Sequence, residues 1–162
     1  MIEILRLIST CRSRRPARVS AFLDALFRRL AHCARTEADE TEDRIWAVWM
    51  HYPHDGAARE LDLATGDIAA QRFDIAETRL TRLLRRAPDF AEAWHKRAAL
   101  YYMLGRDDDC LSDIRRTLEL EPRHFGAMLH FAEIARPARA AAEARLALFM
   151  ARSIHPHLTI PD

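Results

Sequence analysis

The chain has 162 residues, a length that suits one domain with a hydrophobic core of its own. Apolar residues make up 49% of it and charged residues 30%, with only four glycines and seven prolines. This composition excludes a chain that is disordered throughout and argues against a turn-rich β protein, so it favours helices. Three widely spaced cysteines and no C-x-x-C pair argue against a disulfide framework and a zinc site.

Residues 1–18 hold a short apolar stretch followed by clustered arginines. Residues 1–35 carry a local charge of +6, whereas the remainder carries −5. The arginines follow the apolar stretch, which is the reverse of the order in a secretory signal, and no apolar run is long enough to span a bilayer. We expect residues 1–18 to be a basic, disordered leader. The alternatives are a transit peptide, or an arm that contacts anionic lipid or nucleic acid through Arg12, Arg14, Arg15 and Arg18.

Residues 19–56 are expected to form two helices, near 19–35 and 40–52. The second helix has an apolar-rich stretch on a helical period, formed by Ile45, Trp46, Val48, Trp49 and Tyr52.

The rest of the chain repeats itself every 34 residues. Pro88, Pro122 and Pro156 are separated by this interval. Two columns of small residues obey the same period: Ala64, Ala98 and Ala132, then Ala76, Cys110 and Ala144. Large apolar residues recur at Leu80, Ile114 and Leu148. We infer three repeats, at residues 57–90, 91–124 and 125–158, with residues 159–162 as a tail.

This pattern resembles the tetratricopeptide-repeat (TPR) family, whose signature is W-x2-L-G-x2-Y, then A-x3-F, then P. The best copy spans residues 91–124 and contains Trp94, Ala98, Tyr101, Cys110, Ile114 and Pro122. It departs from the signature at Arg97, where leucine is usual, and residues 57–90 depart at Asp67, where an aromatic residue is expected. The resemblance implies an all-α fold, a TPR-type α-solenoid of antiparallel helix pairs. Residues 19–56 then form a degenerate TPR-like capping hairpin. The stretch from Pro88 also resembles a group of small bacterial and organellar TPR proteins that are mostly uncharacterised.

The resemblance also implies a binding surface, because TPR proteins bind peptides or helices in a concave groove lined by the first helix of each repeat. The family's groove positions correspond here to Leu61, Thr65, Glu92, His95, Lys96, Ala99, Tyr102, Met103, Leu129, His130 and Glu133. Tyr102 and Met103 offer the amphipathic and adaptable apolar contacts that recognition surfaces use. The alternative is that both side chains pack within the stack of repeats. The basic clamp of chaperone-binding TPR domains is absent from the matching positions.

The last repeat is expected to present an apolar face. Leu146, Phe149 and Met150 occupy positions that are polar in the two preceding repeats. Their spacing places them on one face of a helix, and an array of repeats needs a polar cap at its end. We therefore expect this face to form a homodimer or to dock a partner helix. The alternative is that Leu158 and Ile160 fold back over it.

No residue pattern indicates catalysis, a cofactor or a metal ion. Cys110 occupies a column of packed alanines, and Asp107, Asp108 and Asp109 lie where acidic residues favour a helix N-terminus. The histidine pairs His51 with His54, His155 with His157, and His95 with His130 lack the ligand density of a metal site. We predict no catalytic residue, no cofactor and no metal.

The sequence therefore predicts a non-catalytic TPR adaptor in the cytoplasm that binds a peptide or helix of a protein partner. Nucleic acid is not the expected partner, and no transmembrane segment is expected. The alternatives are a self-associating structural protein that uses its last helix, and an accessory subunit tethered by the Arg-rich N-terminus. An organellar location after a transit peptide is the alternative to the cytoplasm.

Overall fold

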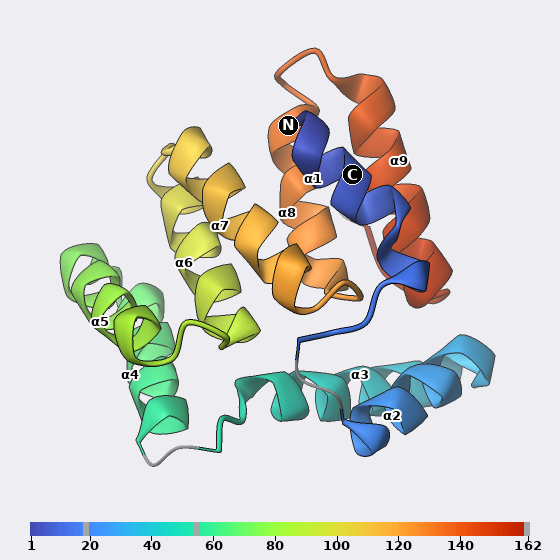
Figure 1. Ribbon diagram of the computed structural model, residues 1–162, viewed down its shortest axis with the longest axis horizontal. Coiled ribbons are helices and arrows are strands. Elements are labelled where there is room, and N and C mark those ends of the chain that lie inside the picture. Colours follow the sequence, from blue (N-terminus) through green and yellow to red (C-terminus); the bar gives the residue numbers. More distant parts are fainter. Residues whose placement is uncertain (18–19, 54–55, 161–162) are drawn as a thin grey trace.

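The computed structural model describes residues 1–17, 20–53 and 56–160, and in these residues the chain is all-α, as predicted. The helices are α1 (Ile2–Ser9), the 3-10 helix η1 (Cys11–Ser13), α2 (Ala21–His32), α3 (Arg35–Met50), α4 (Ala57–Ala69), α5 (Phe73–Arg86), α6 (Ala91–Met103), α7 (Asp107–Leu120), α8 (Phe125–Ala135) and α9 (Ala141–Ile154). Figure 1 shows α4–α5, α6–α7 and α8–α9 as three neighbouring helical hairpins. None of the described helices is long and apolar enough to cross a membrane.

The three hairpins follow the predicted period of 34 residues. Their first helices begin at Ala57, Ala91 and Phe125, and their second helices at Phe73, Asp107 and Ala141. The small residues of the two repeated columns are buried where the helices approach one another: Ala64, Ala76, Ala98, Cys110, Ala132 and Ala144. The columns are therefore a packing pattern, because larger side chains would not fit between the helix axes.

The start of the chain is not the disordered leader that its composition predicts. Residues 2–9 form α1, which packs against α7 and α9. Ile4 and Ile8 are four residues apart, so they lie on one helix face, and both are buried in the larger core. Composition alone does not predict this helix, because the spacing of its apolar residues decides which face packs against the core. The described residues therefore do not form a free N-terminal arm that could tether the chain to a complex.

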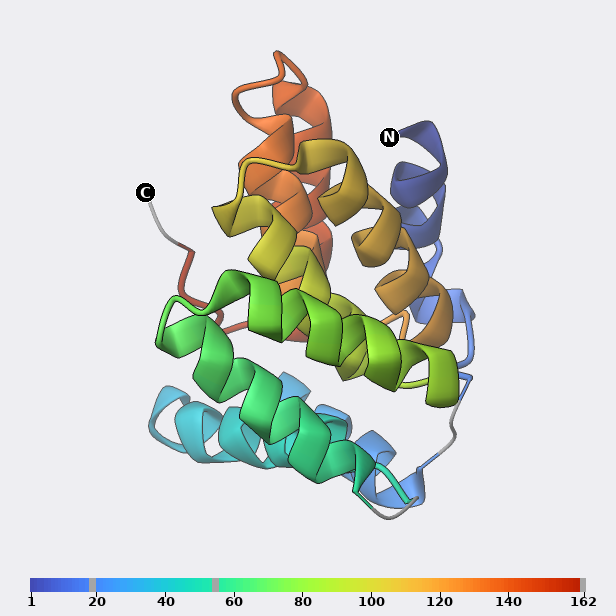
Figure 2. The same ribbon diagram turned by 90° about the vertical axis from the view of Figure 1, so that its left-hand side faces the viewer.

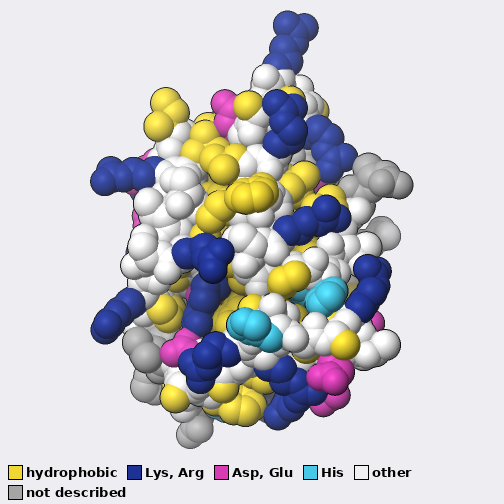
Figure 3. Space-filling model, turned by 90° about the vertical axis from the view of Figure 1, so that its right-hand side faces the viewer, with side chains coloured by type: hydrophobic (Ala, Val, Ile, Leu, Met, Phe, Trp, Pro, Cys, Tyr) yellow, Lys and Arg dark blue, Asp and Glu magenta, His cyan; other side chains and the backbone are white. Residues whose placement is uncertain are grey.

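The segment after α1 is also held to the fold. The guanidinium of Arg14 donates hydrogen bonds to the carbonyl oxygens of Leu118 (2.9 Å) and Glu119 (3.2 Å) at the end of α7. Arg18 lies outside the described residues. Figure 2 shows α1 and the C-terminal segment on opposite sides of the repeats. The face that carries α9 has basic side chains around a group of hydrophobic ones, with fewer acidic side chains (Figure 3).

The hairpin of α2 and α3 does not cap the array in the expected way. A hairpin stacked in series would contact only the first repeat, whereas α3 contacts both α4 and α6, and α2 contacts α9. Figure 1 shows the two helices lying across the ends of the repeat helices. The physical reason lies in Trp46 and Trp49, whose rings pack against side chains of the second and third repeats.

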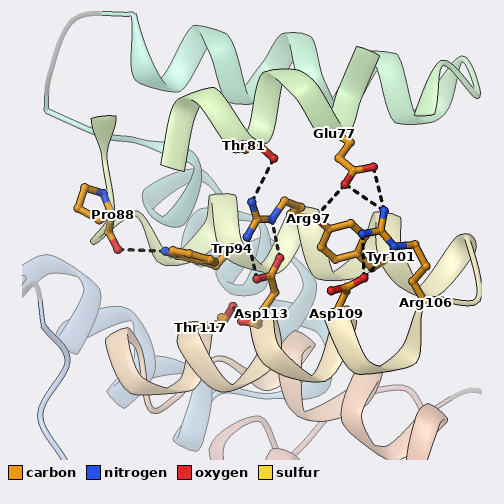
Figure 4. Close-up of polar contacts among 10 residues, drawn as sticks. All are labelled: Glu77, Thr81, Pro88, Trp94, Arg97, Tyr101, Arg106, Asp109, Asp113 and Thr117. Atoms are coloured by element: carbon orange, nitrogen blue, oxygen red, sulfur yellow. Dashed lines mark hydrogen bonds and ion pairs between the residues drawn. The ribbon is translucent and has the colours of Figure 1, made fainter. Parts of the chain in front are cut away.

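Each departure from the family signature has a compensating partner. Arg97 on α6 makes two hydrogen bonds to Asp113 on α7, of 2.7 and 3.0 Å, and one of 3.2 Å to Thr81 on α5. Figure 4 shows this network linking the first repeat to the second. Asp67 is buried, and its carboxylate accepts hydrogen bonds from Arg72 (2.7 Å) and Arg79 (3.0 Å). Buried charges are therefore paired, which is the condition for tolerating them.

Candidate functional site

The predicted groove residues divide into a buried group and an accessible group. Leu61, Glu92 and His95 are buried. Tyr102 and Met103 are 40% and 54% exposed. The remaining predicted groove residues are partly exposed: Thr65, Lys96, Ala99, Leu129, His130 and Glu133. The first turns of α6 are therefore closed, whereas its last turn is open.

Helix α3 closes the first turns of α6. The ring of Trp46 stacks on His95, with centroids 5.9 Å apart and planes 26° apart, and the Lys96 ammonium lies 5.7 Å from the Trp46 ring centroid. Trp49 stacks on His124 at 4.2 Å and 7°. Because these rings occupy the surface that Glu92 and His95 would offer, the chain itself covers this part of the predicted groove.

Gly126 shows how closely α3 approaches the third repeat. A Cβ atom at this position would lie 2.8 Å from the Trp46 ring and 3.2 Å from the His95 ring. Only glycine lets the backbone of α8 come this near to both rings. A glycine inside a helix normally costs stability, so its presence at this buried position indicates a packing requirement.

A buried carboxylate lies beneath the two tryptophans. Glu92 accepts hydrogen bonds from His124 Nε2 (2.8 Å) and His95 Nδ1 (3.5 Å), and the Lys96 ammonium lies 3.2 Å away. Burial alone would raise the pKa of Glu92, but His95 and His124 outweigh it and hold this pKa below its ordinary value. The group is therefore a paired anion inside the core.

Two histidines of this region, His95 and His130, have pKa values below the ordinary range. Burial lowers the pKa of His95 to about 4, with further lowering by His124 and Lys96. Burial, His95 and Lys96 lower the pKa of His130 to about 4. Nε2 of His95 and Nδ1 of His130 are buried and have no hydrogen-bond partner among the described residues. These two rings consequently act as stacking surfaces more than as hydrogen-bonding groups.

The ligand atoms of Glu92, His95 and His124 all lie within 4.8 Å of one another, which invites a metal-site interpretation. The hydrogen bonds argue against it. Nδ1 of His124 accepts the backbone N–H of Ala127 (3.2 Å), so the ring proton is on Nε2, which faces Glu92. A metal ion at Nε2 would force that proton onto Nδ1, against the Ala127 N–H. The nearby Lys96 ammonium would also repel a cation.

The other predicted histidine pairs are not brought together as ligands. His155 Nε2 is 2.8 Å from Glu42, and His157 Nε2 is 3.0 Å from the carbonyl oxygen of Cys33. Both contacts join the C-terminal segment to the α2–α3 hairpin. His54 lies outside the described residues.

A row of stacked rings connects the closed part of α6 to the open part. The rings of His95 and His130 are 5.0 Å apart, and those of His130 and Tyr102 are 6.0 Å apart, with planes inclined by 27° and 25°. Tyr102 ends the row at the surface, next to Met103. The structure thus favours an accessible pair over the alternative in which both side chains pack inside the stack.

The predicted interface on α9 is only partly open. Phe149 is 69% exposed, whereas Leu146 and Met150 are partly buried. Helix α1 packs against α9, which the sequence analysis did not foresee. Leu158 is buried in the larger core, yet the C-terminal segment leaves Phe149 uncovered.

The part that α3 plays in the site is not predicted by the sequence. The apolar period of Trp46 and Trp49 predicts an end cap instead. Gly126 was the available signal, because it places the smallest residue next to Phe125 in the first turn of an expected helix. An isolated glycine in a helical pattern can indicate a packing requirement.

Comparison with known proteins places the best repeat where the sequence pattern does. A family model described as tetratricopeptide repeat matches residues 91–124, which form α6 and α7. A curated TPR repeat-containing protein of Rhizobium etli is 47% identical over 47 residues. These residues are 29% of this chain and 23% of that protein, so the likeness is local.

Proposed function

We propose that this chain, whose residues 91–124 match the tetratricopeptide-repeat model, is a non-catalytic adaptor that holds a partner segment at the open end of α6. Tetratricopeptide repeats are protein–protein interaction modules, and proteins of the family are generally non-catalytic. The observation that carries the proposal is the exposure of Tyr102 (40%) and Met103 (54%) side by side on the helix of the best-matched repeat.

The surroundings of this pair suggest the chemistry of the partner. His130 stacks on Tyr102, and Glu133 lies three residues further along α8, on the same helix face. Burial raises the pKa of Glu133 because it disfavours the charged carboxylate. A basic group near this carboxylate would offset that cost. We propose a partner segment with an apolar side chain over Tyr102 and Met103 and a lysine or arginine toward Glu133.

Co-purification of partners with wild type and with the double variant Tyr102→Ala, Met103→Ala tests the proposal. A specific partner is expected to be lost from the variant while the circular dichroism spectrum stays unchanged. A photo-cross-linking amino acid placed at Ala99 maps the contact directly, because Ala99 lies within one helical turn of Tyr102. The cross-linked partner peptide is expected to contain a basic residue close to an apolar one.

Leu63→Ala, Ile75→Ala is the matched control. These two side chains are 43% and 50% exposed, and they lie on α4 and α5 outside the predicted groove. Removing them changes the exposed apolar area by a similar amount. If both double variants lose the same partner, or if neither does, the open end of α6 is not the binding surface.

A second candidate function, self-association through α9, is favoured by Phe149. At 69% exposure it is the most accessible phenylalanine of the described residues. A large apolar side chain on a helix that ends a repeat array is a candidate contact for a second copy. Leu146 and Met150, three residues before and one residue after Phe149 on α9, are partly exposed.

Sedimentation velocity of wild type and Phe149→Glu at micromolar concentration separates the two candidate functions. Self-association predicts a dimer that the glutamate converts to a monomer. A monomeric wild type at every concentration tested removes this candidate and leaves the α6 proposal untouched, since the two surfaces share no residue.

A further inference from the structure

A surface cavity of about 430 Å³ lies away from the proposed partner surface, between the segment after α1, helix α2 and the end of α9. Among the described residues that line it, five are arginines and one, Asp24, is acidic. The arginines are Arg12, Arg14, Arg15, Arg28 and Arg123. Residues far apart in the sequence therefore place a concentration of positive charge at one hollow.

Two of the five arginines are fixed in position. Arg123 donates hydrogen bonds to Asp24 (2.6 Å) and Glu121 (2.9 and 3.0 Å), and its guanidinium lies 4.3 Å from the ring centroid of Phe27. Arg14 donates to two carbonyl oxygens of α7, which are neutral acceptors, so its charge is not cancelled by an acid.

The other three arginines are free to engage a ligand. Arg12, Arg15 and Arg28 are exposed, and none has an acidic partner among the described residues. Like charges gathered around a hollow repel one another unless an anion is present, so the arrangement gains stability when an anion binds.

The floor of the cavity is apolar and packed. Cys11, Phe27 and Ile154 line it and are each less than a tenth exposed. Arg123 covers the Phe27 ring, and the other ring that lines the cavity is His32, whose Nδ1 lies 2.8 Å from the carbonyl oxygen of Arg28. The lining therefore offers one small imidazole in place of the row of aromatic faces on which single-stranded nucleic acids stack. The residues therefore suit an anionic group better than a base.

We propose that this cavity binds a phosphate group, carried either by a soluble phosphorylated molecule or by a phospholipid headgroup. Guanidinium groups match the oxygens of phosphate in a two-bonded geometry, and charge-assisted hydrogen bonds of this kind are stronger than neutral ones. Arg12, Arg15 and Arg28 close on the phosphate, while Arg14 and the apolar floor hold its position.

The test compares wild type with the triple variant Arg12→Gln, Arg15→Gln, Arg28→Gln. Calorimetric titration with inorganic phosphate and with pyrophosphate probes the soluble source. Co-sedimentation with phosphatidylcholine vesicles, with and without phosphatidic acid, probes the lipid source. We expect affinity for at least one probe to fall about tenfold or more in the variant, which corresponds to losing one or more strong hydrogen bonds.

The matched control is Arg59→Gln, Arg85→Gln, Arg86→Gln. These arginines are also exposed, they lie on α4 and α5 at the far side of the molecule, and their loss changes the net charge equally. Retained binding in this control supports the cavity, with the probe that binds identifying the source. Equal weakening in both variants, or no binding of any phosphate probe, would overturn the proposal.

Discussion

One face of helix α6 is buried near the start of the helix and exposed near its end. Near its start, Glu92 and His95 are buried beneath Trp46, whereas Tyr102 and Met103 near its end are exposed. Both pairs occupy positions that the resemblance to the repeat family assigns to the groove. The difference arises outside the repeats, in α3, which reaches one end of α6 only. Family positions thus identify a face, and the neighbouring segments decide how much of it a partner can reach.

The largest test of this contrast is Trp49→Ala. Trp49 is 6% exposed and stacks on His124, so truncation leaves a cavity and uncovers Glu92. We expect the free energy of unfolding to fall by about 3–5 kcal/mol, the usual cost of removing a buried tryptophan. Urea denaturation followed by circular dichroism measures it. A loss below about 1 kcal/mol would show that α3 is not firmly docked on the repeats.

Gly126→Ala tests the docking of α3 on the repeats by adding a single carbon atom. Replacing glycine by alanine inside a helix ordinarily stabilises by roughly 0.5–1 kcal/mol, and we expect this at Gly66, where an added Cβ would meet nothing within 4 Å. At Gly126 the Cβ would meet Trp46 at 2.8 Å, so we expect a loss of about 1–3 kcal/mol instead. Thermal and urea unfolding of the two variants give the signs directly.

A Trp46→Ala background sharpens this result. With the indole ring removed, Gly126→Ala should cost less than it does in the wild-type chain, since its closest contact has gone. A coupling energy of about 1 kcal/mol or more between the two positions is expected for side chains in direct contact. Additive costs would place the strain elsewhere, for instance at His95.

The repeats were predictable from sequence because they depend on local, periodic packing. Spaced prolines and small residues at Ala98 and Cys110 reflect contacts between helices that are close in the chain. The docking of α3 and α1 depends on contacts between residues far apart, and a single sequence carries no periodic sign of them. A tryptophan at position 46 is equally consistent with an end cap and with a side chain that covers His95. Only Gly126, which faces Trp46, indicates in the sequence that α3 comes close to α8.

The buried histidines predict that acid weakens the closed end. The pKa of His95 and of His130 is lowered to about 4, so between pH 6.5 and 4 the unfolded chain binds protons that the folded chain does not. Stability is therefore full above pH 6.5 and is lost as the pH falls toward 4. From pH 7 to 5, we expect each histidine to cost about 1–2 kcal/mol.

His130→Gln provides the comparison for that pH dependence. The variant should lose less stability than wild type between pH 7 and 5, because one titrating group is gone, and urea midpoints at the two pH values measure the difference. The lowered pKa of Glu92 does not interfere, since its contribution is lost only below pH 4.5. Identical slopes for the two proteins would mean that the pKa of His130 is not lowered in the folded chain.

The smallest effect is expected at the open end, from Tyr102→Ala, Met103→Ala. Both side chains are substantially exposed, so their truncation removes little buried area from the folded chain. The ring contact that is lost is the stacking of Tyr102 on His130, whose centroids are 6.0 Å apart. We expect a change below about 1 kcal/mol in the free energy of unfolding, in the range of ordinary surface substitutions. This stability is what makes the pair informative in binding experiments. If a partner no longer binds a variant that unfolds at the same urea concentration as wild type, the cause is a lost contact and not unfolding of the chain. A destabilisation comparable to that of Trp49→Ala would mean that the two ends of α6 do not differ, and the open surface would then belong to the core.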